Sequence, residues 1–337
     1  MIQEALARLV EGGSLSATEA ELAMSEVMAG DCTPAQIGAL LTALRMKGET
    51  AEEVAGFARA MRSGCIAVRT QHAEVVDTCG TGGDRCDTFN ISTAAALVAA
   101  GAGIPIAKHG NRSVSSQCGS ADVLRELGVN LELTPQQVGW CLDDVGIGFL
   151  FAPHLHPAMR HALGPRREMA IRTVFNVLGP LTNPAGARRQ LLGVFAADWA
   201  RRIAEALAAL GTDRALVVHG LDGLDEISTT GPTLICLVEG GEVTESTVTP
   251  EAFGLPRVAV EGIAGGSPAE CAAMLVRVLE GERGPRRDVV VLNAAAAIYV
   301  GGGAESIEAA LPAAEQSIDS SQARLKLHRL VEVSQGA

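Results

Sequence analysis

The stretch VVDTCGTGGDRCDTFNISTAAALVAAGAG, from Val75 to Gly103, carries the pattern that decides the fold. A short apolar run leads into a loop with three glycines, and an alanine-rich segment begins after Asn90. This order is typical of a buried strand, a tight connection and a helix in an α/β domain. Glycines let backbone N–H groups approach an anion closely, and a helix N-terminus favours negative charge. The loop is therefore either a plain structural turn or a cradle for a phosphate group.

The alternation of strands and helices continues from this stretch towards the end of the chain. Alanine-rich stretches at 92–103, 198–211 and 267–281 have the length and composition of helices. We therefore predict an α/β domain over residues 72–337 with a largely parallel central sheet, whose ligands should bind beyond the carboxyl ends of the strands. The short apolar runs that predict strands occur at 74–77, 103–110, 146–153, 189–195, 214–220 and 288–295.

The first 65 residues differ from this pattern, because they contain three clear helix starts. Ser16, Thr33 and Thr50 are each followed three residues later by Glu or Gln, and apolar residues recur at helical spacing behind each start. These capping boxes predict a small all-helical domain over residues 1–65, which can serve simply as a packing or dimerisation surface. A proline-rich stretch at 157–185 interrupts the strand and helix alternation, and we expect its helices to join the small domain.

Composition argues against several classes of function. A net charge of −12 and an aromatic content of 3% disfavour a general nucleic-acid binder, which needs basic and stacking side chains. No apolar run approaches the roughly 20 residues that span a bilayer, and the N-terminal segment lacks the basic region and cleavage site of a signal peptide. The eight cysteines include no Cys-x-x-Cys pair, so we expect reduced thiols. We therefore expect a cytoplasmic protein with no nucleic-acid or membrane partner.

Charged side chains follow two of the predicted strands. Lys108 and Arg112 leave the run at 103–110 together with several hydroxyl groups. Two adjacent acids, Asp225 and Glu226, follow a later strand, and such carboxylates suit Mg²⁺, which often bridges acids to substrate phosphates. Each feature alone is also compatible with a solvated surface loop. Together they predict a site for a phosphorylated ligand and a metal ion.

Five motifs occur in a fixed order along the chain. They are Gly-Thr-Gly-Gly-Asp at 80–84, Asn-Ile-Ser-Thr at 90–93, Lys-His-Gly-Asn-Arg at 108–112, Arg-Thr-Val-Phe-Asn with Leu-Gly-Pro-Leu-Thr-Asn-Pro over 172–184, and Asp-Glu at 225–226. With these motifs the chain resembles the anthranilate phosphoribosyltransferases over nearly its whole length. The resemblance implies a nucleoside phosphorylase-like fold and transfer of the 5-phosphoribosyl group of 5-phosphoribosyl 1-diphosphate (PRPP) to the amine of anthranilate, in tryptophan biosynthesis. It also implies a homodimer that associates through the small helical domain.

The resemblance further implies which positions bind the substrates and metal. Two Mg²⁺ ions would be held by the PRPP diphosphate together with Ser92, Asp225 and Glu226. The positions implied near anthranilate are Gly80, Asn111 and Arg166, with His109 and His156 as further neighbours. The positions that match the family's PRPP site are Gly80, Gly83, Asp84, Thr88, Asn90, Ile91, Ser92, Thr93, Lys108, His109, Gly110, Asn111, Arg112, Ser113, Val114, Ser115, Ser116 and Ser120.

The implied chemistry needs no side chain as a general base. Positive charge develops on the ribose as the diphosphate leaves, and Lys108 and the loop amides would stabilise the departing anion. The amine of anthranilate is already a nucleophile, and Arg166 would orient it by binding the carboxylate. Asp84 is an acid beside an anion cradle, so we expect it to order the loop or to meet the phosphate through metal or water.

The chain departs from the family pattern at two points, and two other interpretations stay open. Met169 and Ala170 stand where the family commonly has Leu-Gly, and Cys79 stands where it commonly has Val. Pyrimidine nucleoside phosphorylases share the architecture, but they bind phosphate through Lys-x-Ser-x-Arg, whereas position 110 here is glycine. A nucleic-acid-binding relative of the fold would carry a basic face, which the net charge of −12 disfavours.

Overall fold

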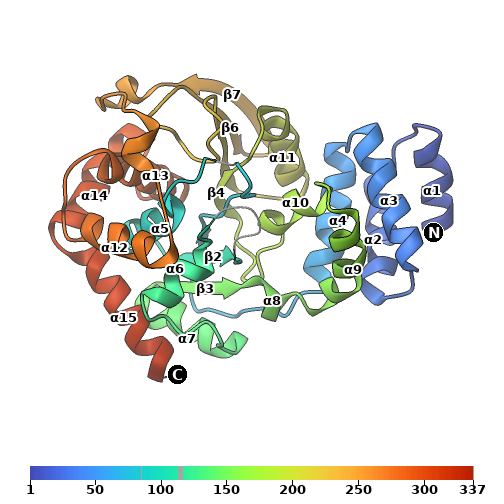
Figure 1. Ribbon diagram of the computed structural model, residues 1–337, viewed down its shortest axis with the longest axis horizontal. Coiled ribbons are helices and arrows are strands. Elements are labelled where there is room, and N and C mark those ends of the chain that lie inside the picture. The colour runs from blue at the N-terminus through green and yellow to red at the C-terminus, as the bar shows by residue number, and fades with distance from the viewer. Residues whose placement is uncertain (85, 113–116, 337) are drawn as a thin grey trace.

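The computed structural model describes residues 1–84, 86–112 and 117–336, and it consists of a small helical part and a larger α/β part (Figure 1). The small part begins with the helices α1 (Ile2–Val10), α2 (Ala17–Ala29), α3 (Pro34–Lys47) and α4 (Ala51–Ser63). The predicted capping boxes are confirmed, because Ser16, Thr33 and Thr50 each accept a hydrogen bond from the backbone N–H three residues on. The helices therefore begin where the local sequence predicts.

Within the described residues, one seven-stranded sheet forms the centre of the larger part. Its strands are β1 (Val76–Asp77), β2 (Ile106–Gly110), β3 (Ile147–Phe151), β4 (Arg189–Gly193), β5 (Arg214–Gly220), β6 (Thr233–Glu239) and β7 (Glu242–Val248). They lie in the order β3-β2-β1-β4-β5-β6-β7. Strands β1 to β5 pair in parallel, and β6 and β7 add antiparallel pairs. The predicted α/β fold with a largely parallel sheet is therefore confirmed.

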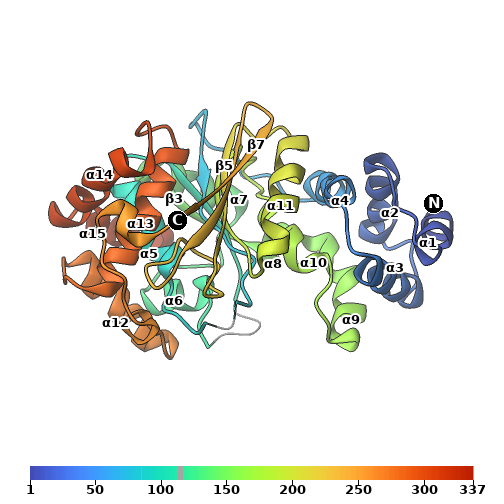
Figure 2. The same ribbon diagram turned by 90° about the horizontal axis from the view of Figure 1, so that it is seen from above.

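Helices cover both faces of this sheet. Those of the larger part are α5 (Ile91–Gly101), α6 (Ser120–Glu126), α7 (Pro135–Val145), α11 (Ala197–Ala209), α12 (Pro268–Leu279), α13 (Pro285–Val300), α14 (Ile307–Asp319) and α15 (Gln322–Gly336), with single 3₁₀ turns at Pro250–Phe253 and Val260–Ile263. Figure 2 shows α5 and α12 to α15 on one face. On the other face, α11 packs on the sheet and contacts α4, so it joins the larger part to the small one.

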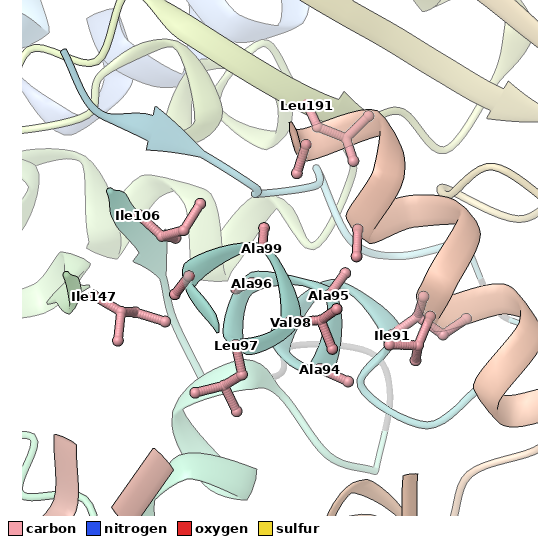
Figure 3. Close-up of a cluster of buried hydrophobic side chains, with 14 of the residues drawn as sticks. Ile91, Ala94, Ala95, Ala96, Leu97, Val98, Ala99, Ile106, Ile147 and Leu191 are labelled. Atoms are coloured by element: carbon pink, nitrogen blue, oxygen red, sulfur yellow. The ribbon is translucent and has the colours of Figure 1, made fainter. Parts of the chain in front are cut away.

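Helix α5 lies at the centre of the core, and its packing holds its first turn in place. Every residue from Ala94 to Ala100 is at most 1% exposed. Figure 3 shows Ile106 and Ile147 of the sheet beside this helix, while α13 packs closely against it. Small alanine side chains allow this close approach. The first turn of α5, which carries Ser92, is therefore held firmly near the ends of the strands.

The segment after β3 runs to the small helical part and returns to the sheet. It contains α8 (Ala152–Leu155), α9 (Arg160–Met169) and α10 (Phe175–Leu178), with 3₁₀ turns at Pro157–Met159 and Gly179–Leu181. Helix α9 packs against α2 and α3, and α10 packs against α4. Ala162 and Phe175 share one apolar cluster with Met24 and Phe57. These contacts agree with the expected joining of 157–185 to the small domain, and the limits of the two domains stay a prediction.

The prediction of a strand at 288–295 is wrong, because this run lies inside α13. The helix begins after Gly284 with Pro285 at its first position, and its valine and alanine side chains are buried on all sides. A fully buried helix has no apolar stripe, so its periodicity does not distinguish it from a buried strand. Strands β6 and β7 are additions to the predicted sheet, and they form a hairpin around Gly240 and Gly241, both of which have positive φ.

Candidate active site

The carboxyl ends of β1 and β4 mark the point where the strand order reverses, which is where α/β sheets bind ligands. Just beyond β1, Gly80 pairs with Gly193 at the end of β4. A Cβ atom on Gly80 would lie 2.8 Å from Asp225 Oδ2, and one on Gly193 would lie 1.6 Å from the Asp225 carbonyl oxygen. Gly193 therefore requires glycine because the backbone of the loop after β5 packs directly against it, and a side chain at Gly80 would displace the Asp225 carboxylate.

The glycine-rich loop at 80–84 is fastened to both neighbouring strand ends. The Gly82 N–H donates to Asp225 Oδ2 at 2.9 Å, and the Thr81 N–H donates to the Gly193 carbonyl at 2.8 Å. One loop amide is thus engaged by a carboxylate of the chain itself. The loop is a structured turn. The Asp225 carboxylate bonds it at the place where the sequence predicts a bound phosphate group.

Arg172 covers the same loop from the segment that follows α9. Its guanidinium donates to the Gly83 carbonyl and lies 4.3 Å above the centre of the Phe195 ring. Two residues earlier, Ala170 ends α9 with a φ of 52°. This left-handed conformation favours glycine, which is the residue that the family commonly has there. The departure at Ala170 therefore introduces local backbone strain and leaves the charged groups in place.

Acidic side chains converge beside the loop. The carboxyl group of Asp84 contacts that of Asp225, and its Oδ1 accepts from the Cys86 N–H at 3.2 Å, so Asp84 also orders the loop. The Ser92 N–H donates to the carboxylate of Glu226. Burial raises the pKa of Asp225 to about 7 and that of Glu226 to about 8, and repulsion among the acids adds to both shifts. The charge of Lys108 opposes the shift of the Glu226 pKa without cancelling it, so burial and mutual repulsion keep the cluster from ionising fully.

These donors fit a divalent cation that shares its coordination with a ligand. Oxygen ligands are those that Mg²⁺ prefers, and it commonly retains water or substrate phosphate beside one or two carboxylates. Within the described residues, no group of three His, Cys, Asp or Glu side chains is arranged to hold a metal ion alone. A cation at Asp225 and Glu226 would therefore need the Ser92 hydroxyl, water or phosphate oxygens as well.

Lys108 is buried in the middle of β2, with 3% of its surface exposed. Its Nζ donates to the Thr78 carbonyl at 2.5 Å and to Ser92 Oγ at 3.2 Å. Burial lowers the pKa of the ammonium group, and the charges of Asp77 and Glu226 oppose that shift. Lys108 thus links the end of β1 to the first turn of α5, beside the acidic cluster.

His109 points to the opposite face of the sheet, as alternate residues of a strand do. Its Nδ1 lies 3.2 Å from the Gly179 carbonyl, and its Nε2 lies 3.2 Å from His156 Nε2. Because a carbonyl only accepts, Nδ1 of His109 carries the hydrogen and His156 Nε2 donates to His109 Nε2. Burial lowers the pKa of His109 to about 3 and that of His156 to about 4, so both rings are neutral at pH 7.

The segment after β2 carries further predicted residues. Gly110 ends the strand, and Asn111 and Arg112 are exposed beyond it. The Arg112 guanidinium lies 5.8 Å from the centre of the Phe151 ring, and Ser120 Oγ donates to the Asn111 carbonyl at 3.3 Å. The predicted residues Ser113, Val114, Ser115 and Ser116 lie outside the described residues.

Some predicted residues do not present their side chains to the site. Ile91 and Thr93 are each 1% exposed and are buried in the core around α5, so only their backbone N–H groups belong to the helix terminus. Asn90 Nδ2 donates to the Cys118 carbonyl at 3.1 Å. Thr88 forms a bridge with Ala264. These residues shape the loop between β1 and α5 through local contacts.

Arg166 lies on α9, and its helix packs against the small helical part. Its guanidinium lies 5.0 Å from the centre of the Phe175 ring, and burial lowers its pKa. Within the described residues, no carboxylate forms an ion pair with it. A half-buried arginine without an acidic partner suits a carboxylate ligand. The structure does not bring Arg166 into contact with Lys108 or His109, which lie on the sheet.

Comparison with known proteins agrees with this architecture. Residues 3–65 match the family model "Glycosyl transferase family, helical bundle domain", and residues 72–324 match "Glycosyl transferase family, a/b domain". The anthranilate phosphoribosyltransferase of Desulforudis audaxviator is 56% identical over 335 residues, which are 99% of this chain and 97% of that protein. The chain belongs to the anthranilate phosphoribosyltransferase family.

Solved structures of this transferase family superpose closely on the chain. The anthranilate phosphoribosyltransferase of Thermus thermophilus has a TM-score of 0.93 and 44% identity, covering 98% of this chain and 99% of that one. That of Saccharomyces cerevisiae in complex with PRPP and Mg has a TM-score of 0.89 and 29% identity, covering 100% of this chain and 98% of that one.

No helix within the described residues is long and apolar enough to cross a membrane.

Several residues of the candidate site were not predicted from the sequence. Gly193 contacts the glycine-rich loop, and Thr78 contacts Lys108. The pattern of a single strand does not reveal such partners, because they come from other parts of the chain. Asp77 and Asn183 are also buried at the strand ends. An acid inside an otherwise apolar strand is the one signal that identifies Asp77, because a buried carboxylate requires partners.

Proposed function

We propose that the chain transfers the 5-phosphoribosyl group of PRPP to the amine of anthranilate, giving N-(5-phosphoribosyl)anthranilate and diphosphate in tryptophan biosynthesis. The observation that carries this proposal is that β2 separates two environments. One face presents Lys108 and Ser92 beside Asp225 and Glu226, which suits a diphosphate with a cation. The other face presents the neutral His109 ring, which suits an uncharged aromatic surface. The family and the yeast complex with PRPP and Mg support the same reaction.

On the PRPP side, we propose that Ser92, Asp225 and Glu226 hold Mg²⁺, with two ions in the complete site. When bound, the metal supplies positive charge against the charge that develops on the leaving diphosphate. Lys108 adds a fixed ammonium group at the same place, and the N-terminus of α5 adds backbone donors. The other positions in 80–93 and 108–120 that match the family stay proposed PRPP contacts.

On the anthranilate side, orientation is the main task of the protein. Arg166 would bind the carboxylate of anthranilate, since it has no acidic partner among the described residues. His109 and His156 would provide a neutral wall, and Gly80 and Asn111 would complete the contacts. The amine is already a nucleophile, so no side chain is required as a general base.

The activity is tested by the fluorescence of anthranilate, which should fall when PRPP and Mg²⁺ are added and should persist when EDTA is present. Asp225→Asn should lower turnover about 10- to 100-fold at low Mg²⁺, because it removes a proposed metal ligand. Asp198→Asn, at an exposed acid on α11, is the matched control and should behave as the wild type. Persistent fluorescence with ample PRPP and Mg²⁺ would refute the proposal, and release of thymine from thymidine and phosphate would favour a phosphorylase.

We further propose a homodimer that forms through the small helical part and a cytoplasmic location. Val10 on α1 and Met46 on α3 are 72% and 83% exposed, so they are among the apolar side chains of the small part that such an interface would cover. No disulfide links the eight cysteines, all of which lie within the described residues, and this suits a reducing compartment.

A further inference from the structure

Asp77, the last residue of β1, is a fully buried carboxylate to which the proposed function assigns no role. Its Oδ1 accepts from the His109 N–H at 3.0 Å. Its Oδ2 accepts from Asn183 Nδ2 at 2.7 Å and from the Cys79 thiol at 3.2 Å. Burying a carboxylate is costly unless its oxygens are hydrogen-bonded, and Asp77 has three such donors. What these donors belong to shows what the carboxylate holds in place.

The bond from the His109 N–H to Asp77 explains how β2, which stays paired with β3, continues beyond the end of β1. The two strands pair at Val76 and Ile106, after which β1 turns away into the glycine-rich loop while β2 runs on to Gly110. The His109 N–H then has no strand carbonyl on that side, and Asp77 replaces it. This N–H belongs to the peptide between Lys108 and His109, whose side chains face opposite sides of the sheet.

The bond from Asn183 Nδ2 links the Asp77 carboxylate to the segment 179–183, which packs against the His109 ring. Asn183 Nδ2 donates to the Ala107 carbonyl at 2.8 Å as well as to Asp77. The segment 179–183 also supplies the Gly179 carbonyl that receives the His109 ring. One side chain at the end of β1 thus fixes both the Lys108–His109 peptide and the backbone that orients the histidine pair.

We propose that Asp77 is a positioning residue that sets the distance between the two substrates by holding this peptide and the segment 179–183 against β1. The inference rests on the proposed function, in which Lys108 serves the PRPP side and His109 the anthranilate side. A misplacement of about 1 Å at a reacting centre can lower the rate about 100-fold. Loss of Asp77 should therefore reduce turnover more than it weakens binding of either substrate.

The test compares Asp77→Asn with Cys79→Val. Asp77→Asn keeps the shape and one acceptor oxygen for the His109 N–H, but places an amide donor against Asn183. We expect kcat to fall at least 10-fold, with KM for PRPP and for anthranilate within threefold of wild type. Cys79→Val removes the third hydrogen bond to the same carboxylate, together with the thiol's contacts to Gln190 and the Pro180 carbonyl, but it leaves the bonds from His109 and Asn183 in place. Its kcat should stay within twofold.

A wild-type kcat for Asp77→Asn, an equal loss in Cys79→Val, or a loss confined to KM would overturn the proposal. If Asp77→Asn does not fold, Asn183→Ala tests the proposal instead, because it removes one of the two hydrogen bonds by which Asp77 holds its neighbours. It should lower kcat at least threefold at unchanged KM, and a wild-type kcat there also overturns the proposal.

Hydrogen exchange separates this proposal from the proposed function, because it requires no substrate. The backbone amide of His109 should exchange at least tenfold faster in Asp77→Asn than in wild type or Cys79→Val, because the new amide donor repels Asn183 and moves the acceptor oxygen away from this N–H. Unchanged exchange would count against Asp77 as the anchor even if the enzyme is active. A wild-type protein that consumes no anthranilate would refute the proposed function while leaving the exchange result intact.

Discussion

Glu49, in the turn between α3 and α4, shows how a single residue can link stability to pH. It is 2% exposed, and within the described residues neither carboxylate oxygen has a hydrogen-bond partner in another side chain. Burial raises the pKa of its carboxyl group, and its own backbone N–H, Arg45 and Arg202 oppose the shift. The folded protein therefore keeps a proton that the unfolded chain releases near the ordinary pKa of 4.5. Stability should fall as the pH rises from that value through the higher pKa of the folded state.

Glu49→Gln should remove this decline. The neutral amide avoids a buried ionised group, so we expect the free energy of unfolding to rise by about 1–2 kcal/mol at pH 8. At pH 4 the carboxyl group of the wild type is protonated in the fold, and the two proteins should be equally stable. Urea unfolding at both pH values measures the difference. Glu52→Gln, at the exposed acid nearby, is the control, and an equal effect of Glu49→Gln at both pH values would contradict the argument.

At the scale of elements, sequence patterns predict the helices and strands whose signals lie within a few residues. They fail where contacts with distant parts of the chain determine the structure. The strand, loop and helix of 75–103 and the capped helices of the first 65 residues are confirmed, because their signals lie within a few residues. The run at 288–295 is a helix instead, since its burial on all sides by α5 and α14 removes the amphipathic pattern. The acids after β5 were predicted, whereas Gly193 was not, because its requirement for glycine comes from Asp225 far along the chain.

Helix α13 matters for the site because it carries Asn293. This residue is fully buried, its Oδ1 accepts from the Ile227 N–H at 3.0 Å, and its Nδ2 donates to the Ile227 carbonyl at 2.9 Å. Ile227 directly follows Glu226, so α13 holds the backbone of the proposed metal ligands. A strand at this position would not present the side chain to that loop.

Asn293→Ala should therefore lower stability and weaken the metal site together. It leaves the N–H and carbonyl of Ile227 without partners, which we expect to cost about 1–3 kcal/mol in the free energy of unfolding. The Mg²⁺ concentration for half-maximal turnover should rise severalfold. Asn130→Ala is the matched control, because Asn130 also bonds the backbone, at Ser334, far from the site. An unchanged Mg²⁺ requirement in Asn293→Ala, or the same rise in Asn130→Ala, would contradict this prediction.

At the scale of the whole molecule, the proposed anthranilate contacts come from two parts of the chain. Lys108 and His109 lie on β2 and the acids lie in the loop after β5, whereas Arg166 lies on α9 against the small helical part (Figures 1 and 2). Arg172 bridges the two, because it reaches from the returning segment to the glycine-rich loop. All these residues belong to one chain, so none of these proposed contacts depends on the partner in the proposed dimer.

The proposed dimer can therefore be broken without destroying the active site. Val10→Asp combined with Met46→Glu places two charges on the exposed apolar side chains of α1 and α3, which should prevent association. Light scattering after size-exclusion chromatography should give twice the chain mass of 34.8 kDa for wild type and the chain mass for the variant. Turnover per chain should stay within about twofold, because Lys108, Arg166 and the acids come from the same chain. Trp140→Glu, which charges a 49% exposed side chain on α7 of the larger part, should leave the dimer intact. A monomeric wild type, or a variant that keeps the dimer mass, would show that these residues do not form the interface.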